Sequence, residues 1–265
     1  MTGRPGTVLR GVLRMQRRSM VLWAVAVGAV AAMYTAFYPS IGGAKWDVMM
    51  DAMPAGLIEA MGFETMATAA GYVSGTVYSL LGAILTLVCA IGMGARLVAG
   101  HEEDGTIELE LTAPVARWRI YAERLAALWL TVLLLVLTVS AVLLVMSVTM
   151  DLGLSVSHLA AAGVGLWLFG GMFGTLAFAV GAATGRRGVA LGVASGAAVM
   201  AYLFAYLGPL VDADWMESVS PYGWYTSNEP LTNGFDWPGL GLLAALAVLL
   251  VGAGLTRFVR RDLMV

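Results

Sequence analysis

Six long uncharged stretches, each rich in apolar residues, follow one another along the chain. They cover residues 19–44, 65–95, 125–150, 152–185, 188–211 and 237–256. A helix of about 20 apolar residues crosses the roughly 30 Å hydrocarbon core of a bilayer. A charged side chain at the middle of such a helix costs about 2.5–3.5 kcal/mol, so the lack of charge in all six stretches favours insertion. The pattern predicts an all-α polytopic membrane protein with six transmembrane helices.

The segment before the first stretch, residues 1–18, has the pattern of an amphipathic helix. Its apolar residues recur at helical spacing, at Val8, Leu9, Val12 and Leu13. Its arginines fall largely on the other face, at Arg10, Arg14, Arg17 and Arg18. Basic amphipathic helices of this kind lie in the plane of the membrane interface. We therefore expect an N-terminal surface helix ahead of the first span.

The basic residues give the chain an orientation. Fourteen of the fifteen lysine and arginine residues fall on one side of the six predicted spans, and Lys45 is the exception. The positive-inside rule then places both termini and the segment 99–122 in the cytoplasm. We expect a multi-pass protein of a bacterial plasma membrane, with the whole chain, 1–265, forming one six-span domain.

Two predicted external segments, 45–64 and 212–236, are longer than a turn. The second is rich in residues that favour the headgroup level of a membrane, namely Trp215, Tyr222, Trp224 and Tyr225. These segments either anchor the outer interface or form a lid over a translocation path.

Composition excludes several classes of protein. Hydrophobic residues make up 60% of the chain and charged residues 12%, about half the charged fraction of a soluble domain. Cys89 is the only cysteine and His101 and His158 are the only histidines, so we expect no disulfide and no metal site. The net charge of −2 gives no reason to expect a nucleic-acid partner. Lys45 is the only lysine and does not stand in a phosphate-binding loop, so the chain has no P-loop of its own.

Glycines recur at a spacing of four in the fifth predicted span. Gly188, Gly192 and Gly196 form a doubled G-x-x-x-G pattern, which lets helix backbones approach closely in lipid. This stripe either packs within the chain or forms the seam of a dimer.

The most informative segment is the polar one between spans two and three. Asp104 can cap a short helix, and Pro114 is consistent with its end, so we expect a helix over about 105–113. The stretch Glu102-Glu103-Asp104-Gly105-Thr106-Ile107-Glu108-Leu109, followed by Ala113-Pro114-Val115-Ala116-Arg117, resembles the cytoplasmic motif of type-2 ABC export permeases.

This resemblance implies a function and a set of partners. It implies a permease subunit that exports a substrate, most simply a lipophilic or amphipathic one, with ATP and Mg bound by a separate P-loop ATPase subunit. It also implies a second permease chain, the same or homologous, and no cofactor in this chain. The residues carried over as coupling contacts are Glu102, Gly105, Thr106, Glu108, Pro114 and Arg117. The chain alone is then not an enzyme, and ATPase activity is expected only in the complex.

Other classes of membrane protein stay open on the residues alone. An ion-coupled secondary transporter or channel usually carries ionisable groups within its spans, and His158 near the outer end of span four is the candidate. A non-transporting assembly protein would need no such group. An intramembrane protease of the CAAX type needs the motif E-E-x-x-x-R. Here Glu102-Glu103 begins the motif, but position 107 is isoleucine and not arginine.

The predicted orientation can be tested by labelling single cysteines in a Cys89-free background. We expect cysteines at Asp51 and Glu217 to react with an impermeant reagent from outside, and cysteines at Asp104 and Arg186 to be protected. Labelling of position 104 from outside would overturn the orientation.

Overall fold

A computed structural model describes residues 6–41, 68–100, 103 and 116–260. These residues are almost entirely helical, and no strand occurs among them. Six helices are long and apolar enough to cross a membrane, namely Thr7–Ser40, Ala69–Gly100, Arg117–Thr149, Val156–Thr184, Arg187–Leu210 and Trp237–Arg260. The predicted all-α architecture with six spans is confirmed.

The first span is α1 (Thr7–Ile41), and the second runs through α4 (Ala69–Val73), the π-helix η2 (Ser74–Leu81), α5 (Gly82–Ala95) and the π-helix η3 (Arg96–Gly100). The third to fifth spans are α8 (Arg117–Thr149), α9 (Val156–Thr184) and α10 (Arg187–Leu210). The short elements α11 (Asp214–Ser218), α12 (Pro221–Thr226) and η4 (Glu229–Asn233) lead to the sixth span, α13 (Trp237–Arg260).

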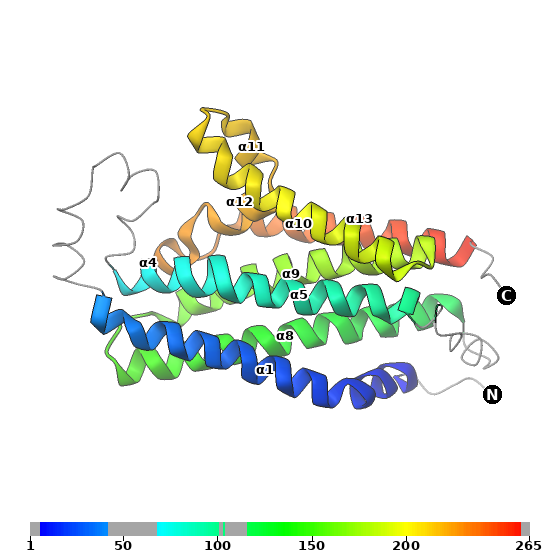
Figure 1. The fold of residues 1–265 in the computed structure, drawn as a ribbon, viewed down its shortest axis with the longest axis horizontal. Coiled ribbons are helices and arrows are strands. Elements are labelled where there is room, and N and C mark those ends of the chain that lie inside the picture. Colours follow the sequence, from blue (N-terminus) through cyan, green and yellow to red (C-terminus); the bar gives the residue numbers. More distant parts are fainter. Residues whose placement is uncertain (1–5, 42–67, 101–102, 104–115, 261–265) are drawn as a thin grey trace.

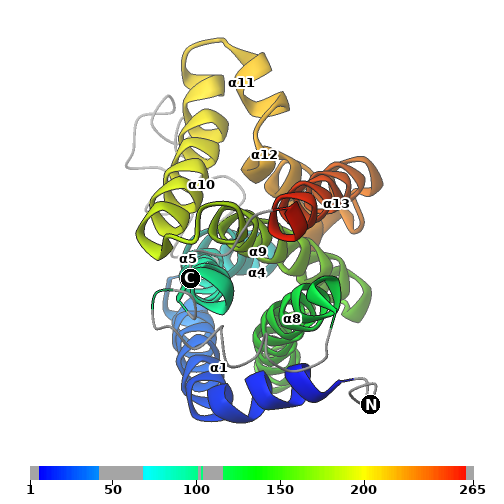
Figure 2. The ribbon, with the colours of Figure 1, turned by 90° about the vertical axis from the view of Figure 1, so that its right-hand side faces the viewer.

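Two helices begin earlier than the uncharged stretches suggested. The amphipathic segment is continuous with the first span in α1, and Figure 2 shows its first turns at an angle to the rest of the helix. The third span begins at Arg117, eight residues before the uncharged stretch 125–150, because its charged first turns lie at the end of the bundle. The expected external segment 45–64 lies outside the described residues.

Consecutive spans run in opposite directions, so Thr7 and Arg260 lie at the same end of the bundle (Figure 1). All twelve arginines that the structure describes are in the helix ends and turns at this end, which we call the basic end. The opposite end, the acidic end, holds six of the described acids, namely Asp151, Asp212, Asp214, Glu217, Glu229 and Asp236. The charge segregation read from the sequence is thus a property of the fold.

Helix α9 lies at the centre of the bundle (Figure 2) and packs against α5, α8, α10 and α13. Its contact with α5 is a backbone contact, because a side chain on Gly94 would meet the carbonyl of Gly174. A Cβ atom on Gly174 would lie 3.1 Å from the carbonyl oxygen of Ala90. Close approach through small residues supplies the van der Waals contact that holds helices together in lipid, where the hydrophobic effect contributes little.

Helix α10 is the least enclosed span, and it leans away from the bundle toward the acidic end (Figure 1). Its inner face, with Ala190, Ala194 and Ala201, is buried. Its glycine stripe behaves differently, because a Cβ atom on Gly188, Gly192 or Gly196 would meet nothing within 4 Å. The stripe is therefore not used for packing within the described chain.

The segment 212–236 folds back against the bundle through α12. The hydroxyl of Ser220 accepts hydrogen bonds from the backbone N–H groups of Tyr222 and Gly223, both at 3.2 Å, and so caps α12. The same hydroxyl donates to the Ala201 carbonyl of α10 at 2.6 Å. This shared serine fixes α12 beside α10.

Candidate functional site

The predicted coupling helix, 105–113, lies outside the described residues, and so do five of the six proposed coupling residues, Glu102, Gly105, Thr106, Glu108 and Pro114. The sixth, Arg117, is the first residue of α8 and follows Ala116, whose backbone is extended. What the structure describes is how the two flanks of segment 101–116 are attached to the bundle.

The first attachment is a hydrogen bond between the flanks themselves. Arg124 on α8 is 1% exposed and donates from Nη1 to the carbonyl oxygen of Leu97 on η3, at 2.6 Å. A charged donor makes a buried hydrogen bond stronger than a neutral pair would. The two ends of segment 101–116 are therefore held together at its base.

The second attachment joins the segment to α10. The carboxylate of Glu103 accepts a hydrogen bond from the backbone N–H of Arg187 at 2.8 Å. Residue Arg186, at the N-cap position of α10, provides no side-chain cap. A carboxylate at a helix N-terminus satisfies an unpaired donor and complements the helix dipole. Glu103 thus replaces the missing cap.

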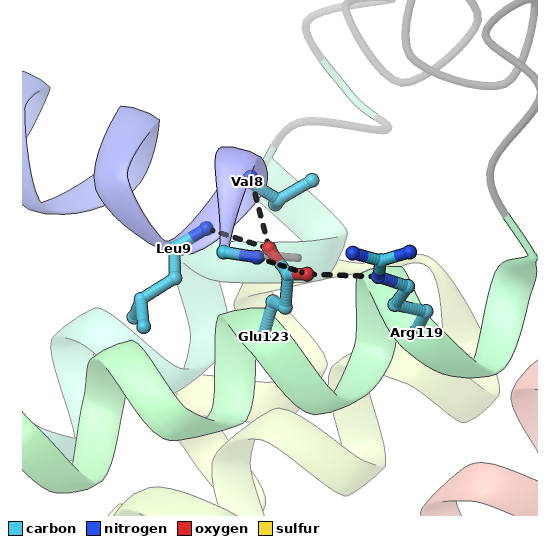
Figure 3. A network of polar contacts seen from close by, with 5 residues as sticks. Val8, Leu9, Arg119 and Glu123 are labelled. Carbon is cyan, nitrogen blue, oxygen red and sulfur yellow. Dashed lines mark hydrogen bonds and ion pairs between the residues drawn. The ribbon is translucent and has the colours of Figure 1, made fainter. Parts of the chain in front are cut away.

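The third attachment joins α8 to the start of α1 (Figure 3). The carboxylate of Glu123 accepts from the backbone N–H groups of Gly6, Val8 and Leu9 at 2.9–3.0 Å. It also pairs with Nε of Arg119 at 3.0 Å. The first turn of α1 has no acidic residue of its own. Glu123 therefore caps α1 from another helix and fixes the angle of its amphipathic start.

An apolar groove lies between α5 and α10, with a volume of about 540 Å³. One wall is the α5 side with Leu80, Ile84, Leu87, Val88 and Ile91, and the other is the α10 side with Leu191, Ser195, Ala198, Val199 and Tyr202. Its size and apolar lining are typical of sites for drug-sized ligands.

Two tyrosines of α12 bond to the second span beside the groove. Tyr222 lines the groove and donates its hydroxyl to the Ser79 carbonyl at 2.9 Å, and Tyr225 donates to the Tyr78 carbonyl at 3.0 Å. Both acceptors belong to the π-helix η2. Burial raises the pKa of Tyr222 to about 12, so its hydroxyl remains a donor at physiological pH.

The family comparison agrees with this architecture. The family model described as the C-terminal domain of the multidrug efflux system permease Rv1217c matches residues 8–259. The chain belongs to this family. The match confirms the resemblance to ABC export permeases. A comparison with curated proteins gave no match.

Potential metal ligands are not clustered in the described part of this permease. No group of three or more histidine, cysteine, aspartate or glutamate side chains that could hold a metal occurs within 6–41, 68–100, 103 and 116–260. Its described polar contacts at the basic end connect helices to one another.

Sequence reasoning on this permease missed the roles of Glu123 and Arg124. Both were visible only as charges next to an apolar stretch, and nothing local indicated that Leu97 or the α1 backbone would be their partners. The one available signal was the absence of an acid from the first turn of α1, which left its N–H groups in need of an outside acceptor.

The Arg124 contact can be tested by the substitution Arg124→Leu. It leaves the Leu97 carbonyl without this donor inside the bundle, at a cost of about 2 kcal/mol. We expect the melting temperature of the permease in detergent to fall by roughly 4–8 °C. The matched variant Arg257→Leu, on the exposed side of α13, should change it little. Equal melting of both variants and the parent would contradict the assigned role.

Proposed function

We propose that the chain is the membrane-spanning subunit of an ABC exporter whose ATP is hydrolysed by a separate ATPase subunit. The observation that supports it most is the attachment of segment 101–116, which carries the export-permease motif. Arg124 joins the two flanks of this segment, and Glu103 bonds the segment to α10. Glu123 bonds α8, which follows the segment, to α1. A displacement of this segment reaches the second and third spans directly and the first and fifth spans through these bonds.

The mechanism is mechanical coupling. The ATPase subunits hold ATP and Mg, and their closure moves the segment that contains Glu102, Gly105, Thr106, Glu108 and Pro114. Arg117 extends this contact at the start of α8. Because α1 and α10 are capped from the flanks of the segment, both follow its motion as rigid helices. In this arrangement the basic end faces the cytoplasm of the cell, in agreement with its arginines.

The substrate is lipophilic or amphipathic. The groove between α5 and α10 supports this, because its walls are aliphatic and aromatic, with the hydroxyls of Ser79, Ser195 and the tyrosines as its polar groups. A charged solute would lose its hydration there without a partner. Tyr222 lines the groove from α12, which supports the second of the two alternatives for segment 212–236, a lid at the outer end of the path.

The complete pathway requires a second permease chain, which packs on the α10 stripe of Gly188, Gly192 and Gly196. All three of these glycines are exposed, and Gly192 and Gly196 each lie one position along the helix from the groove residues Leu191 and Ser195. A second chain on this face would close the open side of the groove. The pathway would then run along the seam between the two chains.

Coupling is tested by Gly105→Pro and Arg117→Glu, expressed together with the ATPase subunit. Proline removes a backbone donor at the start of the expected helix, and the glutamate reverses a charge at its docking surface. We expect both variants to insert normally and to lose most substrate-stimulated ATPase activity or co-purification with the ATPase. The matched control Arg257→Glu reverses a charge at the same end of the bundle, on α13, and should retain both. Full activity of the Gly105 and Arg117 variants would remove the main support for this proposal.

The seam is tested by comparing Gly192→Leu with Gly174→Leu. A side chain at Gly192 meets open space within the chain, whereas one at Gly174 meets Ala90 of α5. We expect Gly192→Leu to melt like the parent and to shift from dimer to monomer when the mass of the detergent complex is measured. Gly174→Leu should lower the melting temperature instead, because overpacking costs about 1–3 kcal/mol. A Gly192→Leu permease that remains dimeric would rule out this seam.

A further inference from the structure

A second cavity lies at the basic end between α1, α5, η3 and α10, and it shares Val88 and Gly92 with the groove. Its volume is about 160 Å³, and we call it the arginine pocket. Its polar side chains are Gln16 and Ser19 on α1, Arg96 on η3, Arg187 on α10 and Thr131 on α8. Its apolar lining includes Met20, Trp23 and Val88.

The two arginines converge because the residue between them is a glycine. A Cβ atom on Gly100 would lie 3.0 Å from Cγ of Arg96 and 3.9 Å from Cδ of Arg187. Any larger residue at position 100 would therefore press on one arginine side chain and approach the other. The fold brings two cations to one cavity, although like charges repel each other.

Neither arginine of this pocket forms an ion pair within residues 6–41, 68–100, 103 and 116–260. The carboxylate of Glu103 is close, but its described hydrogen bond is to the backbone N–H of Arg187, where it caps α10. Two guanidinium groups beside an amide and a hydroxyl form a donor-rich site, which favours an anion.

The size and the apolar lining restrict the anion further. A volume of 160 Å³ holds roughly five water molecules, too small for a drug-sized ligand but sufficient for a phosphate group and its ester oxygens. Met20, Trp23 and Val88 continue the site along the membrane-facing helices as an apolar surface. Trp23 is also of the residue type that favours the headgroup level. The pocket therefore matches a molecule with a phosphate head and a hydrocarbon tail.

We propose that the arginine pocket binds the phosphate of an anionic phospholipid from the leaflet at the basic end. Arg96 and Arg187 hold the phosphate oxygens, Gln16 and Ser19 provide further hydrogen bonds, and the acyl chain lies against Met20 and Trp23. Guanidinium groups suit this role because their planar donors match phosphate oxygens. The bound lipid connects α1, η3 and α10. This site does not depend on the identity of the exported substrate or on an ATPase partner.

The test uses the full chain, delipidated in detergent, and three probes: phosphatidylglycerol, diacylglycerol and inorganic phosphate. Native mass spectrometry gives the affinity for each. We expect phosphatidylglycerol to bind tightly, diacylglycerol to bind weakly because it has no phosphate, and inorganic phosphate to bind weakly because it has no tail. Binding of inorganic phosphate as tight as that of phosphatidylglycerol would overturn the lipid assignment in favour of a soluble phosphate.

Variants then locate the site. Arg96→Gln and Arg187→Gln should each weaken binding of phosphatidylglycerol by roughly tenfold or more, the effect of losing a charged hydrogen bond. Arg186→Gln removes the same charge one residue away, on a side chain that does not line the pocket, and should change the affinity by less than about twofold. Equal weakening by all three would show a general basic surface and overturn the proposal. If a glutamine variant does not fold, Arg96→Lys and Arg187→Lys keep the charge without the planar donors, and unchanged affinity in both would also overturn it.

Discussion

The backbone contact between α5 and α9 is the packing interaction on which the rest of the bundle depends. Gly94 and Gly174 allow these two helices to approach at the level of main-chain atoms. Helix α9 then offers its remaining faces to α8, α10 and α13, so every one of these spans is positioned relative to it. In a bilayer, where lipid tails are as apolar as leucine, such close contact replaces the hydrophobic effect as the source of helix association.

The second span contains a π-helical stretch near each of its ends, η2 and η3. In both stretches the backbone departs from the regular α-helical hydrogen-bond pattern. Tyr225 bonds to the Tyr78 carbonyl in the first, and Arg124 bonds to the Leu97 carbonyl in the second. Irregular backbone at membrane depth is tolerated where other groups bond to it. Here the bonding groups come from α12 and from α8, so both of these helices are attached to the second span.

The sequence predicted the elements of this fold better than their connections. Long uncharged stretches and the arginine distribution were sufficient to predict six spans and a basic end. Charged side chains are costly in the hydrocarbon core, so they collect outside the spans. The start of α8 at Arg117 was missed, since hydropathy marks where charge ends and not where a helix begins. The same G-x-x-x-G pattern occurs on α9, where Gly170 and Gly174 are packed, and on α10, where Gly192 is open. Only the fold distinguishes the two.

The burial of Arg124 also bears on how the protein is made. While α8 enters the membrane alone, this arginine has no Leu97 carbonyl to bond to and keeps its charge in contact with water or headgroups. Its side chain can be withdrawn from water only after the second span is beside it. Because span two precedes span three along the chain, the Leu97 carbonyl is synthesised before the arginine that bonds to it.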